Sequence, residues 1–350
     1  MHILVTGNLG YVGRVVAAHL RASLPGARLT GFDTGYFTHG PALPAAPPED
    51  PVDAQHAGDI RRFPPALLEG VDAVVHLAAI SSDLVGHRFE AVTDAINHRA
   101  TLCLAELARD AGVRRFVLAS SASVYGPAAG GARRETDPLN PVTAYARSKR
   151  AAEEGLQRMD RGRMAVTCLR FPTACGMSPA LRLDLVLNDF VASALAAGEI
   201  ALLSDGTLWR PLIEVQDMAR AIEWAITGDA VQPGEALAVN AGGDAWNLRL
   251  QELAEAVAAE IPGTRVSLNA GAPPDRWSSP LDFSLFRRLA PDHQPRASLA
   301  GSIRALRDGL AALGCAGRDG RAWQLQRLQA LARLTREGML DPELRWASAA

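Results

Sequence analysis

Short apolar runs alternate with helix-period segments through the first half of this sequence, and that alternation limits the possible folds more than any other feature. Strands buried on both faces form continuous apolar runs, whereas helices repeat their apolar residues every three or four positions. The alternation therefore predicts an α/β protein with a doubly wound parallel sheet. The predicted strands are residues 2–6, 28–33, 72–78, 115–119 and 165–170, and the predicted helices are residues 11–24, 90–110 and 143–160.

The pattern becomes less regular after residue 175. We expect residues 1–175 to form the main domain and residues 176–350 to form mainly a smaller α/β lobe, with some of its segments possibly returning to the main sheet. A Pro-rich stretch at 38–53 predicts a surface loop. Leucines at every third position from 325 to 334 predict a C-terminal helix, starting near Ala322, that packs on the parent domain. The other predicted helices are residues 184–197, 215–227 and 247–261, and the other predicted strands are residues 200–203, 212–215 and 236–240.

Composition argues against several classes of function. The net charge is -2 and the basic residues are scattered among acidic ones, so no basic field for nucleic acid is expected. No apolar stretch approaches the roughly 18 residues of a membrane span, and residues 1–7 run directly into a strand pattern without a basic leader. We therefore expect a cytoplasmic protein without a membrane partner. The four cysteines lack paired spacing, so neither a metal site nor a disulfide framework is expected.

A glycine-rich segment, Thr6 to Gly13, lies between the first predicted strand and the first predicted helix. Glycines there let the backbone approach a pyrophosphate, and the helix N-terminus supplies N–H donors and a favourable dipole. Asp33 ends the second strand 20 residues beyond Gly13, where a carboxylate can accept hydrogen bonds from an adenosine ribose. The same carboxylate opposes a 2′-phosphate, and no arginine follows in Thr34-Gly35-Tyr36. The segment predicts a dinucleotide site that prefers NAD to NADP.

Tyr145 and Lys149 lie four residues apart, on one face of a predicted helix. Lys149 is the only lysine among 36 basic residues, and the chain has four tyrosines in 350 residues, so this spacing would rarely arise by chance. An ammonium can bind cofactor ribose hydroxyls while its field lowers the pKa of a phenol. A free phenol ionises near pH ~10. We expect Lys149 and an oxidised nicotinamide to supply the positive charge that makes Tyr145 a usable base.

A polar segment, Ser120 to Gly126, follows the predicted strand 115–119 at the sheet edge where doubly wound folds place their chemistry. Ser121 is the predicted donor that orients the substrate oxygen. Tyr125 is expected to be structural or a sugar contact.

Together these residues resemble the NAD-dependent epimerase/dehydratase family of extended short-chain dehydrogenases. The resemblance implies a Rossmann-type fold, with an NAD-binding domain in residues 1–175 and a substrate-binding lobe in the remainder. It runs from Met1 to about Phe286 through the glycine segment, Asp33, Gly58-Asp59-Ile60, His76-Leu77-Ala78-Ala79, Asn97, Ser120 to Gly126, Tyr145 with Lys149, Leu169-Arg170-Phe171 and Ser204 to Arg210.

The resemblance also implies NAD as cofactor, a nucleotide-diphosphate sugar as substrate, and the residues that contact each. The position of Arg210 usually binds the substrate diphosphate, which suits a guanidinium fork, and Arg276 is a second phosphate candidate. The implied cofactor contacts are Gly7, Asn8, Gly10, Tyr11, Val12, Gly13, Asp33, Asp59, Ile60, Leu77, Ala78, Ala79, Asn97, Tyr145, Lys149 and Phe171. The implied substrate contacts are Ser81, Ser121, Tyr125, Thr173, Arg182, Arg210 and Arg276.

The chain departs from the family's epimerases at several positions. Phe171-Pro172-Thr173 replaces the usual Tyr-Phe-Asn, Pro211 replaces a common aspartate, and Glu214 replaces a frequent histidine. These departures leave the sugar and the nucleotide base open.

Four functions are compatible with the residues. An epimerase, with C4 as the expected carbon, would oxidise the sugar transiently and return the hydride to its other face. A 4,6-dehydratase ranks lower, because Ala122 and Ser123 stand where dehydratases carry Asp-Glu. An NAD(P)-dependent dehydrogenase or 4-ketoreductase would use the same Ser121, Tyr145 and Lys149. The non-enzymatic alternative is a regulatory relative that senses dinucleotide. The resemblance further suggests a homodimer formed through helices 90–110 and 143–160.

Overall fold

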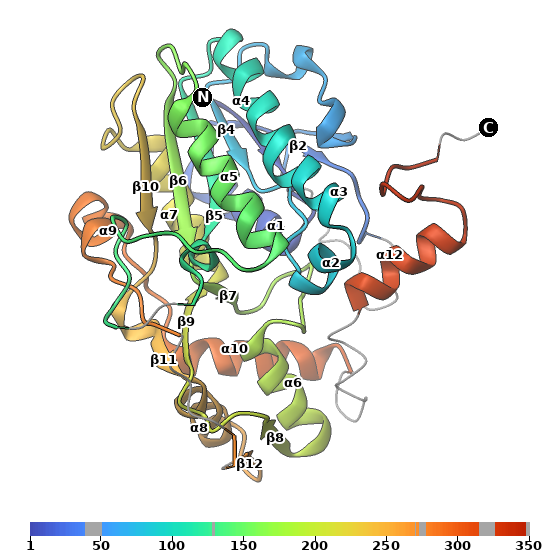
Figure 1. Ribbon diagram of the computed structural model, residues 1–350, viewed down its shortest axis with the longest axis vertical. Coiled ribbons are helices and arrows are strands. Elements are labelled where there is room, and N and C mark those ends of the chain that lie inside the picture. The colour runs from blue at the N-terminus through green and yellow to red at the C-terminus, as the bar shows by residue number, and fades with distance from the viewer. Residues whose placement is uncertain (39–50, 128–129, 270, 273–277, 315–325, 348–350) are drawn as a thin grey trace.

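The computed structural model describes residues 1–38, 51–127, 130–269, 271–272, 278–314 and 326–347, and its centre is a seven-stranded parallel sheet (Figure 1). The strand order is β10-β6-β5-β4-β1-β2-β3, and every neighbouring pair is parallel. The predicted α/β fold is confirmed. The strands are β1 (His2–Thr6), β2 (Arg28–Asp33), β3 (Ala54–Ala57), β4 (Ala73–His76), β5 (Arg115–Ser121), β6 (Ala165–Phe171) and β10 (Ala236–Asn240).

The strand order reverses between β1 and β4. From β1 the chain builds outward through β2 and β3, and it then returns to the other side of β1 to add β4, β5, β6 and β10. Such a switch point opens a crevice beyond the carboxyl ends of the central strands, which is where open α/β sheets bind ligands. The fold therefore places the glycine segment after β1 beside the segment that follows β4.

Helices cover both faces of the sheet. Successive residues of β1 point to opposite faces, and Ile3, Leu4 and Val5 are all apolar, so both faces must be covered. Ile3 and Val5 lie in the apolar cluster with α1 and α7, whereas Leu4 lies in the cluster with α4 and α5. Figure 1 shows α3, α4 and α5 side by side on one face. The bounds are α1 (Tyr11–Ser23), α2 (Asp83–Arg88), α3 (Glu90–Asp94), a π-helical turn (Ala95–Arg99), α4 (Ala100–Asp110), α5 (Ala144–Arg158) and α7 (Val215–Thr227).

A smaller lobe lies beyond the carboxyl edge of the sheet (Figure 1). It contains a three-stranded sheet, β11-β9-β7, a two-stranded parallel sheet, β12-β8, and a separate apolar cluster shared by α6, α8 and α10. Its elements are β7 (Thr173–Cys175), α6 (Val186–Ala197), β8 (Glu199–Leu202), β9 (Trp209–Glu214), β11 (Asn247–Arg249), α8 (Leu250–Glu260), β12 (Arg265–Leu268) and α10 (Leu299–Ala312). Helix α9 (Ser284–Leu289) packs instead on the main domain, where Phe286 contacts Trp224 of α7.

Short 3₁₀ turns complete the regular structure of the two parts. They span Ile60–Arg62, Pro65–Leu68, Ala122–Tyr125, Asp244–Trp246 and Pro291–His293.

Three sequence expectations need correction. The helix expected at 247–261 begins at Leu250, because Asn247–Arg249 pairs with β9 as a strand. Strand β3 was not predicted, since its Gln55 and His56 interrupt any apolar run at the edge of the sheet. The helix expected from 90 to 110 contains a π-helical turn.

The C-terminal helix α12 (Gln326–Arg336) agrees with the leucine periodicity over its described part. Leu331 and Leu334 are buried in the cluster that also holds residues of α4 and α5, so this helix packs on the main domain. Leu325 and most of the loop expected at 38–53 lie outside the described residues. Among the helices that are described, none is both long and apolar enough to cross a bilayer.

A buried ion pair ties α5 to β6 behind the carboxyl edge of the sheet. The Arg170 guanidinium donates to the Glu153 carboxylate, with Nη2 2.7 Å from Oε2 and Nε 3.0 Å from the same oxygen. The two side chains are only 4% and 1% exposed. The Ser120 hydroxyl also donates to Glu153, and Arg170 donates to the Tyr125 hydroxyl at 3.0 Å. Because both charges are desolvated, either one left alone would be costly.

We predict that Arg170→Met lowers the free energy of unfolding by about 3–5 kcal/mol, because it leaves a buried carboxylate without its counter-ion. Urea unfolding followed by circular dichroism measures the loss. The double variant Glu153→Met/Arg170→Met is expected to be more stable than the single variant, since it removes the orphaned charge. If the losses in unfolding free energy of the two single variants simply added up in the double variant, Glu153 and Arg170 would not be coupled.

Candidate functional site

The glycine segment is held against the chain that follows β4 more closely than any side chain would allow. Gly7 has φ +74°, and a Cβ there would lie 2.6 Å from the backbone nitrogen of Ala78. A Cβ on Gly13 would lie 2.2 Å from the carbonyl oxygen of Gly7. Helix α1 begins at Tyr11, so its first N–H groups, which have no intrahelical partner, face this cradle. The cradle fits the pyrophosphate of a dinucleotide.

Asp33, at the end of β2, braces the same segment. Its Oδ2 accepts the N–H of Leu9 at 3.1 Å, and its Oδ1 accepts the N–H of Gly35 at 2.8 Å. Burial raises the pKa of Asp33, while these two N–H groups and the charges of Arg14 and Arg327 act in the opposite direction. The carboxylate thus links β2 to the glycine segment at the cavity wall.

A cavity of about 1200 Å³ runs along the carboxyl edge of the sheet and into the smaller lobe. This exceeds the roughly 300–1,000 Å³ typical of a single small-molecule site, so the cavity has room for a dinucleotide and a second ligand. It brings together most of the residues that the sequence singled out. These are Gly7, Gly10, Tyr11, Val12, Gly13, Asp33, Asp59, Ile60, Leu77, Ala78, Ala79, Ser81, Ser121, Tyr145, Lys149, Phe171, Thr173, Arg182 and Arg210.

Three predicted contact residues do not line this cavity. Asn8 donates its amide to Gln55 at 2.6 Å, and the Tyr125 hydroxyl donates to Asn240 at 2.7 Å. Asn97, on the π-helical turn, bonds the backbone of Ile80 at 2.8 and 2.9 Å. These side chains do not face the cavity. They hydrogen-bond other protein groups and so support the segments that line it. Arg276 lies outside the described residues.

The Ser121, Tyr145 and Lys149 side chains converge on one part of the cavity wall. Lys149 is 2% exposed and donates to the backbone oxygen of Ala119, in β5, at 2.7 Å. Its ammonium lies 5.9 Å from the centre of the Tyr145 ring. The Ser121 hydroxyl accepts a hydrogen bond from the Ser123 hydroxyl at 2.9 Å, and its interaction with Tyr145 lowers the pKa of the phenol. A serine donor, a phenol and an ammonium in this order can hold an oxygen and move its proton.

Burial and nearby groups act on the pKa of the Tyr145 phenol in opposite directions. Burial, and to a smaller extent the charge of Asp83, raise the pKa of Tyr145, whereas the interaction with Ser121 and the positive charge of Arg182 lower it. Burial also lowers the pKa of Lys149 to about 8, against the opposing effect of Glu153. Arg182 is thus a second cation that acts on the phenol, beside the Lys149 ammonium near the Tyr145 ring.

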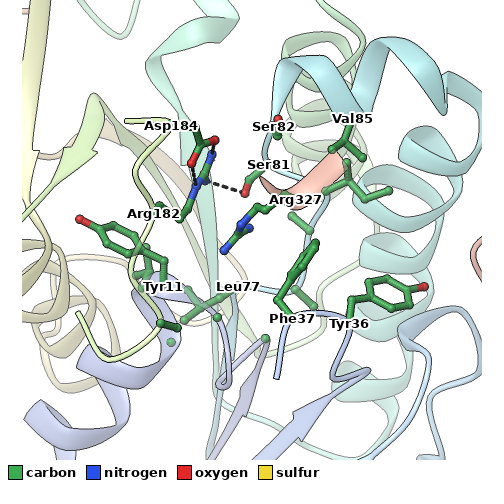
Figure 2. Close-up of a pocket in the computed structure, with 18 of the residues that line it drawn as sticks. Tyr11, Tyr36, Phe37, Leu77, Ser81, Ser82, Val85, Arg182, Asp184 and Arg327 are labelled. Atoms are coloured by element: carbon green, nitrogen blue, oxygen red, sulfur yellow. Dashed lines mark hydrogen bonds and ion pairs between the residues drawn. The ribbon is translucent and has the colours of Figure 1, made fainter. Parts of the chain in front are cut away.

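Arg182 is fixed by polar contacts on the smaller-lobe side of the cavity (Figure 2). Its Nε and Nη2 donate to the two oxygens of Asp184 at 3.0 and 2.6 Å, and its Nη1 donates to Ser81 at 3.0 Å. Arg210, on β9, lines the same cavity from a second strand of that lobe. Two guanidinium groups therefore line the cavity from the smaller lobe, and a guanidinium fork suits an anionic substrate group.

Sequence reasoning missed one wall of the cavity. Tyr36 and Phe37, directly after β2, and Arg327, on α12, all line it. The aromatic pair after Asp33 was a readable signal, but no local pattern indicated that α12 returns to this crevice. Trp346 also reaches the cavity and donates its indole N–H to the backbone oxygen of Thr34 at 2.7 Å.

The family model described as NAD dependent epimerase/dehydratase matches residues 3–242 of the chain. The protein belongs to this family. The resemblance drawn from the sequence is thereby confirmed, and the protein is an NAD-dependent enzyme.

Two curated relatives illustrate the range of the family. YtcB of Bacillus subtilis (strain 168), named an uncharacterized UDP-glucose epimerase, is 29% identical over 247 residues, 68% of this chain and 74% of the relative. A dTDP-glucose 4,6-dehydratase of Streptomyces niveus is 29% identical over 262 residues, 72% of this chain and 76% of the relative. Epimerases and dehydratases are thus both relatives of this enzyme.

A solved structure agrees with this assignment. UDP-glucose-4-epimerase from Stenotrophomonas maltophila, with bound NAD and formylated UDP-arabinopyranose, superposes with a TM-score of 0.73 at 25% identity. The match covers 90% of this chain and 99% of the other.

We predict that the enzyme binds NAD more tightly than NADP, because the Asp33 carboxylate would meet a 2′-phosphate with like charge. Calorimetric titration of the nucleotide-free protein with both cofactors measures the preference, and Asp33→Ala is expected to narrow it. Asp110→Ala, the same change at the exposed end of α4, is the control that should preserve it. Equal or tighter binding of NADP by the wild type would contradict the prediction.

Proposed function

We propose that the protein is a nucleotide-sugar epimerase that inverts a hydroxyl-bearing carbon, C4 of the sugar, with no net consumption of NAD. The observation that carries the proposal is that Ser121, Tyr145 and Lys149 share one cavity with the dinucleotide cradle and with the guanidinium groups of Arg182 and Arg210. The first set can move a proton at a sugar hydroxyl, and the guanidinium groups suit a diphosphate.

Each residue of the first set has a distinct task in the proposed reaction. Ser121 holds the sugar oxygen by a hydrogen bond. Tyr145 takes the proton from that oxygen during oxidation and returns it during reduction. Lys149, which donates to the backbone oxygen of Ala119, would hold the ribose hydroxyls of the cofactor with its ammonium. NAD, when bound, supplies the reversible redox chemistry and a positive charge near the phenol.

The proposed substrate diphosphate binds at the smaller lobe. Arg210 comes from β9 and Thr173 from the neighbouring β7, whereas the glycine cradle lies on the main sheet. The sugar between these two ends would meet Tyr145. Ser81, already bonded to Arg182, lies at the wall of the same space.

Dehydration is less well supported because the catalytic segment lacks carboxylates. Ala122 and Ser123 occupy the first positions of the 3₁₀ turn after Ser121, and Ser123 lines the cavity with a hydroxyl. Asp184 also lines the cavity, but Arg182 occupies both of its oxygens. Elimination of water needs an acid and a base beside the departing groups.

The proposal predicts a product that is a stereoisomer of the substrate, with no build-up of reduced cofactor. The purified enzyme is incubated with UDP-, dTDP-, GDP- and CDP-sugars in deuterated water, and products are analysed by mass spectrometry and NMR while absorbance at the reduced-nicotinamide band is followed. Reduced cofactor accumulating in step with product would instead indicate a dehydrogenase. Loss of water with uptake of solvent deuterium would indicate a dehydratase. No conversion of any sugar while NAD binds normally would favour the dinucleotide-sensing alternative.

On the substrate found in that panel, Tyr145→Phe is expected to lower kcat by at least about 100-fold, the lower end of a general acid–base contribution. NAD affinity should stay within about twofold, since the ring is retained and only the proton-transferring hydroxyl is lost. Steady-state kinetics and calorimetric titration measure the two effects. Turnover close to that of the wild type would exclude Tyr145 as the base.

Lys149→Arg is expected to abolish most activity although it retains the charge. The ammonium occupies a buried site against Ala119 that a planar guanidinium cannot fill in the same way. Kinetics on a variant with native circular dichroism measure the loss, with Arg147→Lys, an exposed change on the same helix, as the control. Activity within a few-fold of wild type would show that this lone lysine is incidental.

A further inference from the structure

The C-terminal segment is fastened to the side of the cleft that holds Asp33 and Asp59. The Tyr36 hydroxyl donates to the backbone oxygen of Leu344, and Arg61 donates to that of Glu343 at 2.7 Å. The same Arg61 binds the Asp59 carboxylate through Nε at 2.9 Å. Trp346 also donates to Thr34, as described above. The loop after β2 and the 3₁₀ turn that contains Arg61 are therefore both hydrogen-bonded to residues 343–346.

Apolar contacts fix α12 itself. Leu331 and Leu334 are 1% and 6% exposed, and Leu340 and Leu344, after the helix, are 2% and 0% exposed. All four belong to the cluster beneath the main sheet that contains Phe32 and Ile60. The position of α12 at the cavity is therefore set by the core of the main domain.

Arg327, on α12, lines the cavity. Its guanidinium lies 4.5 Å from the centre of the Phe37 ring and points into the space between Phe37 and Arg182 (Figure 2). Within the described part of the chain, no hydrogen bond or ion pair reaches it. Burial and the charge of Arg182 lower the pKa of Arg327 to about 9, and Asp184 and Asp33 oppose this effect. An anion in this space would stabilise the cation and relieve its repulsion with Arg182.

The place of Arg327 in the fold indicates which anion. Leu77, which follows β4, and the glycine segment, which follows β1, line the same cavity, and the strand order reverses between these two strands. A dinucleotide lays its pyrophosphate across that switch point. Arg327 acts on Asp33 at the β2 end of the cavity, whereas Arg210 and Thr173 come from the smaller lobe.

We propose that Arg327 binds a pyrophosphate, that of the dinucleotide cofactor, and that α12 with residues 339–347 forms a strap that retains the cofactor through repeated turnovers. The inference does not depend on which sugar reaction the enzyme performs. A diphosphate could also come from the sugar nucleotide, and the two sources are separated by experiment.

The test is calorimetric titration of Arg327→Gln. Nucleotide-free protein is titrated with NAD, and NAD-loaded protein is titrated with UDP as a probe of the sugar-nucleotide site. Loss of a charge-assisted hydrogen bond predicts about 10- to 100-fold weaker NAD binding and unchanged UDP binding. Arg336→Gln, the same change at an exposed position of α12 outside the cavity, is the matched control and should bind both ligands like wild type.

The remaining outcomes decide against the proposal. Unchanged NAD affinity would overturn it, and weaker UDP binding with unchanged NAD binding would assign Arg327 to the sugar nucleotide instead. If Arg327→Gln fails to fold, Arg327→Lys serves in its place. That variant keeps the charge but loses the planar guanidinium, so a smaller but measurable loss of NAD affinity is expected. An NAD affinity equal to that of the wild type would overturn the proposal.

Discussion

The cleft depends on one close approach, that of the glycine segment to the chain after β4. Gly7 can lie against Ala78 only because it has no side chain, and its positive φ turns the backbone toward α1. The Asp33 carboxylate is bonded to the Leu9 N–H of the same segment, which ties the end of β2 to it. Three neighbouring strands, β2, β1 and β4, thereby end at one continuous wall, and the N-terminus of α1 faces the space that a pyrophosphate would occupy. A residue with a side chain at position 7 would push the glycine segment away from the chain after β4.

Helix α5, which carries Tyr145 and Lys149, is fixed by polar contacts on the other side of the switch point. Three side chains of this helix bond three different elements. Ser148 accepts the Asn97 amide from the π-helical turn at 3.1 Å, Lys149 donates to the backbone of β5, and Glu153, one turn further on, pairs with Arg170 of β6. These contacts leave Tyr145, one turn earlier, at the cavity wall. Asn97 and Arg170 therefore act on the chemistry by holding α5 in place, and a phenol positioned this firmly can give and take a proton at one defined oxygen.

The sequence predicted those parts of the fold and site that local patterns encode. Apolar runs revealed the inner strands, the glycine spacing located the close turn after β1, and the lone Lys149 four residues after Tyr145 pointed to a helix face that does line the cavity. Strand β3 escaped because an edge strand needs no apolar run. Arg327 and Trp346 escaped because their role depends on where a distant segment folds back, which no periodicity records. The opposing effects of burial and of Arg182 on the pKa of Tyr145 also could not be read from the sequence, since both arise only from tertiary packing.

The central claim is that the redox cycle closes within a single binding event, so that the hydrogen removed from the sugar is returned to the same molecule. The most direct test uses the substrate found in the sugar panel, deuterated at C4 and mixed with an unlabelled sugar nucleotide carrying a distinguishable base. An epimerase that keeps its hydride within one binding event yields an epimerised product that retains deuterium at C4, and the other product gains none. Deuterium lost to solvent, or transferred to the second sugar nucleotide through a shared pool of reduced cofactor, would contradict it.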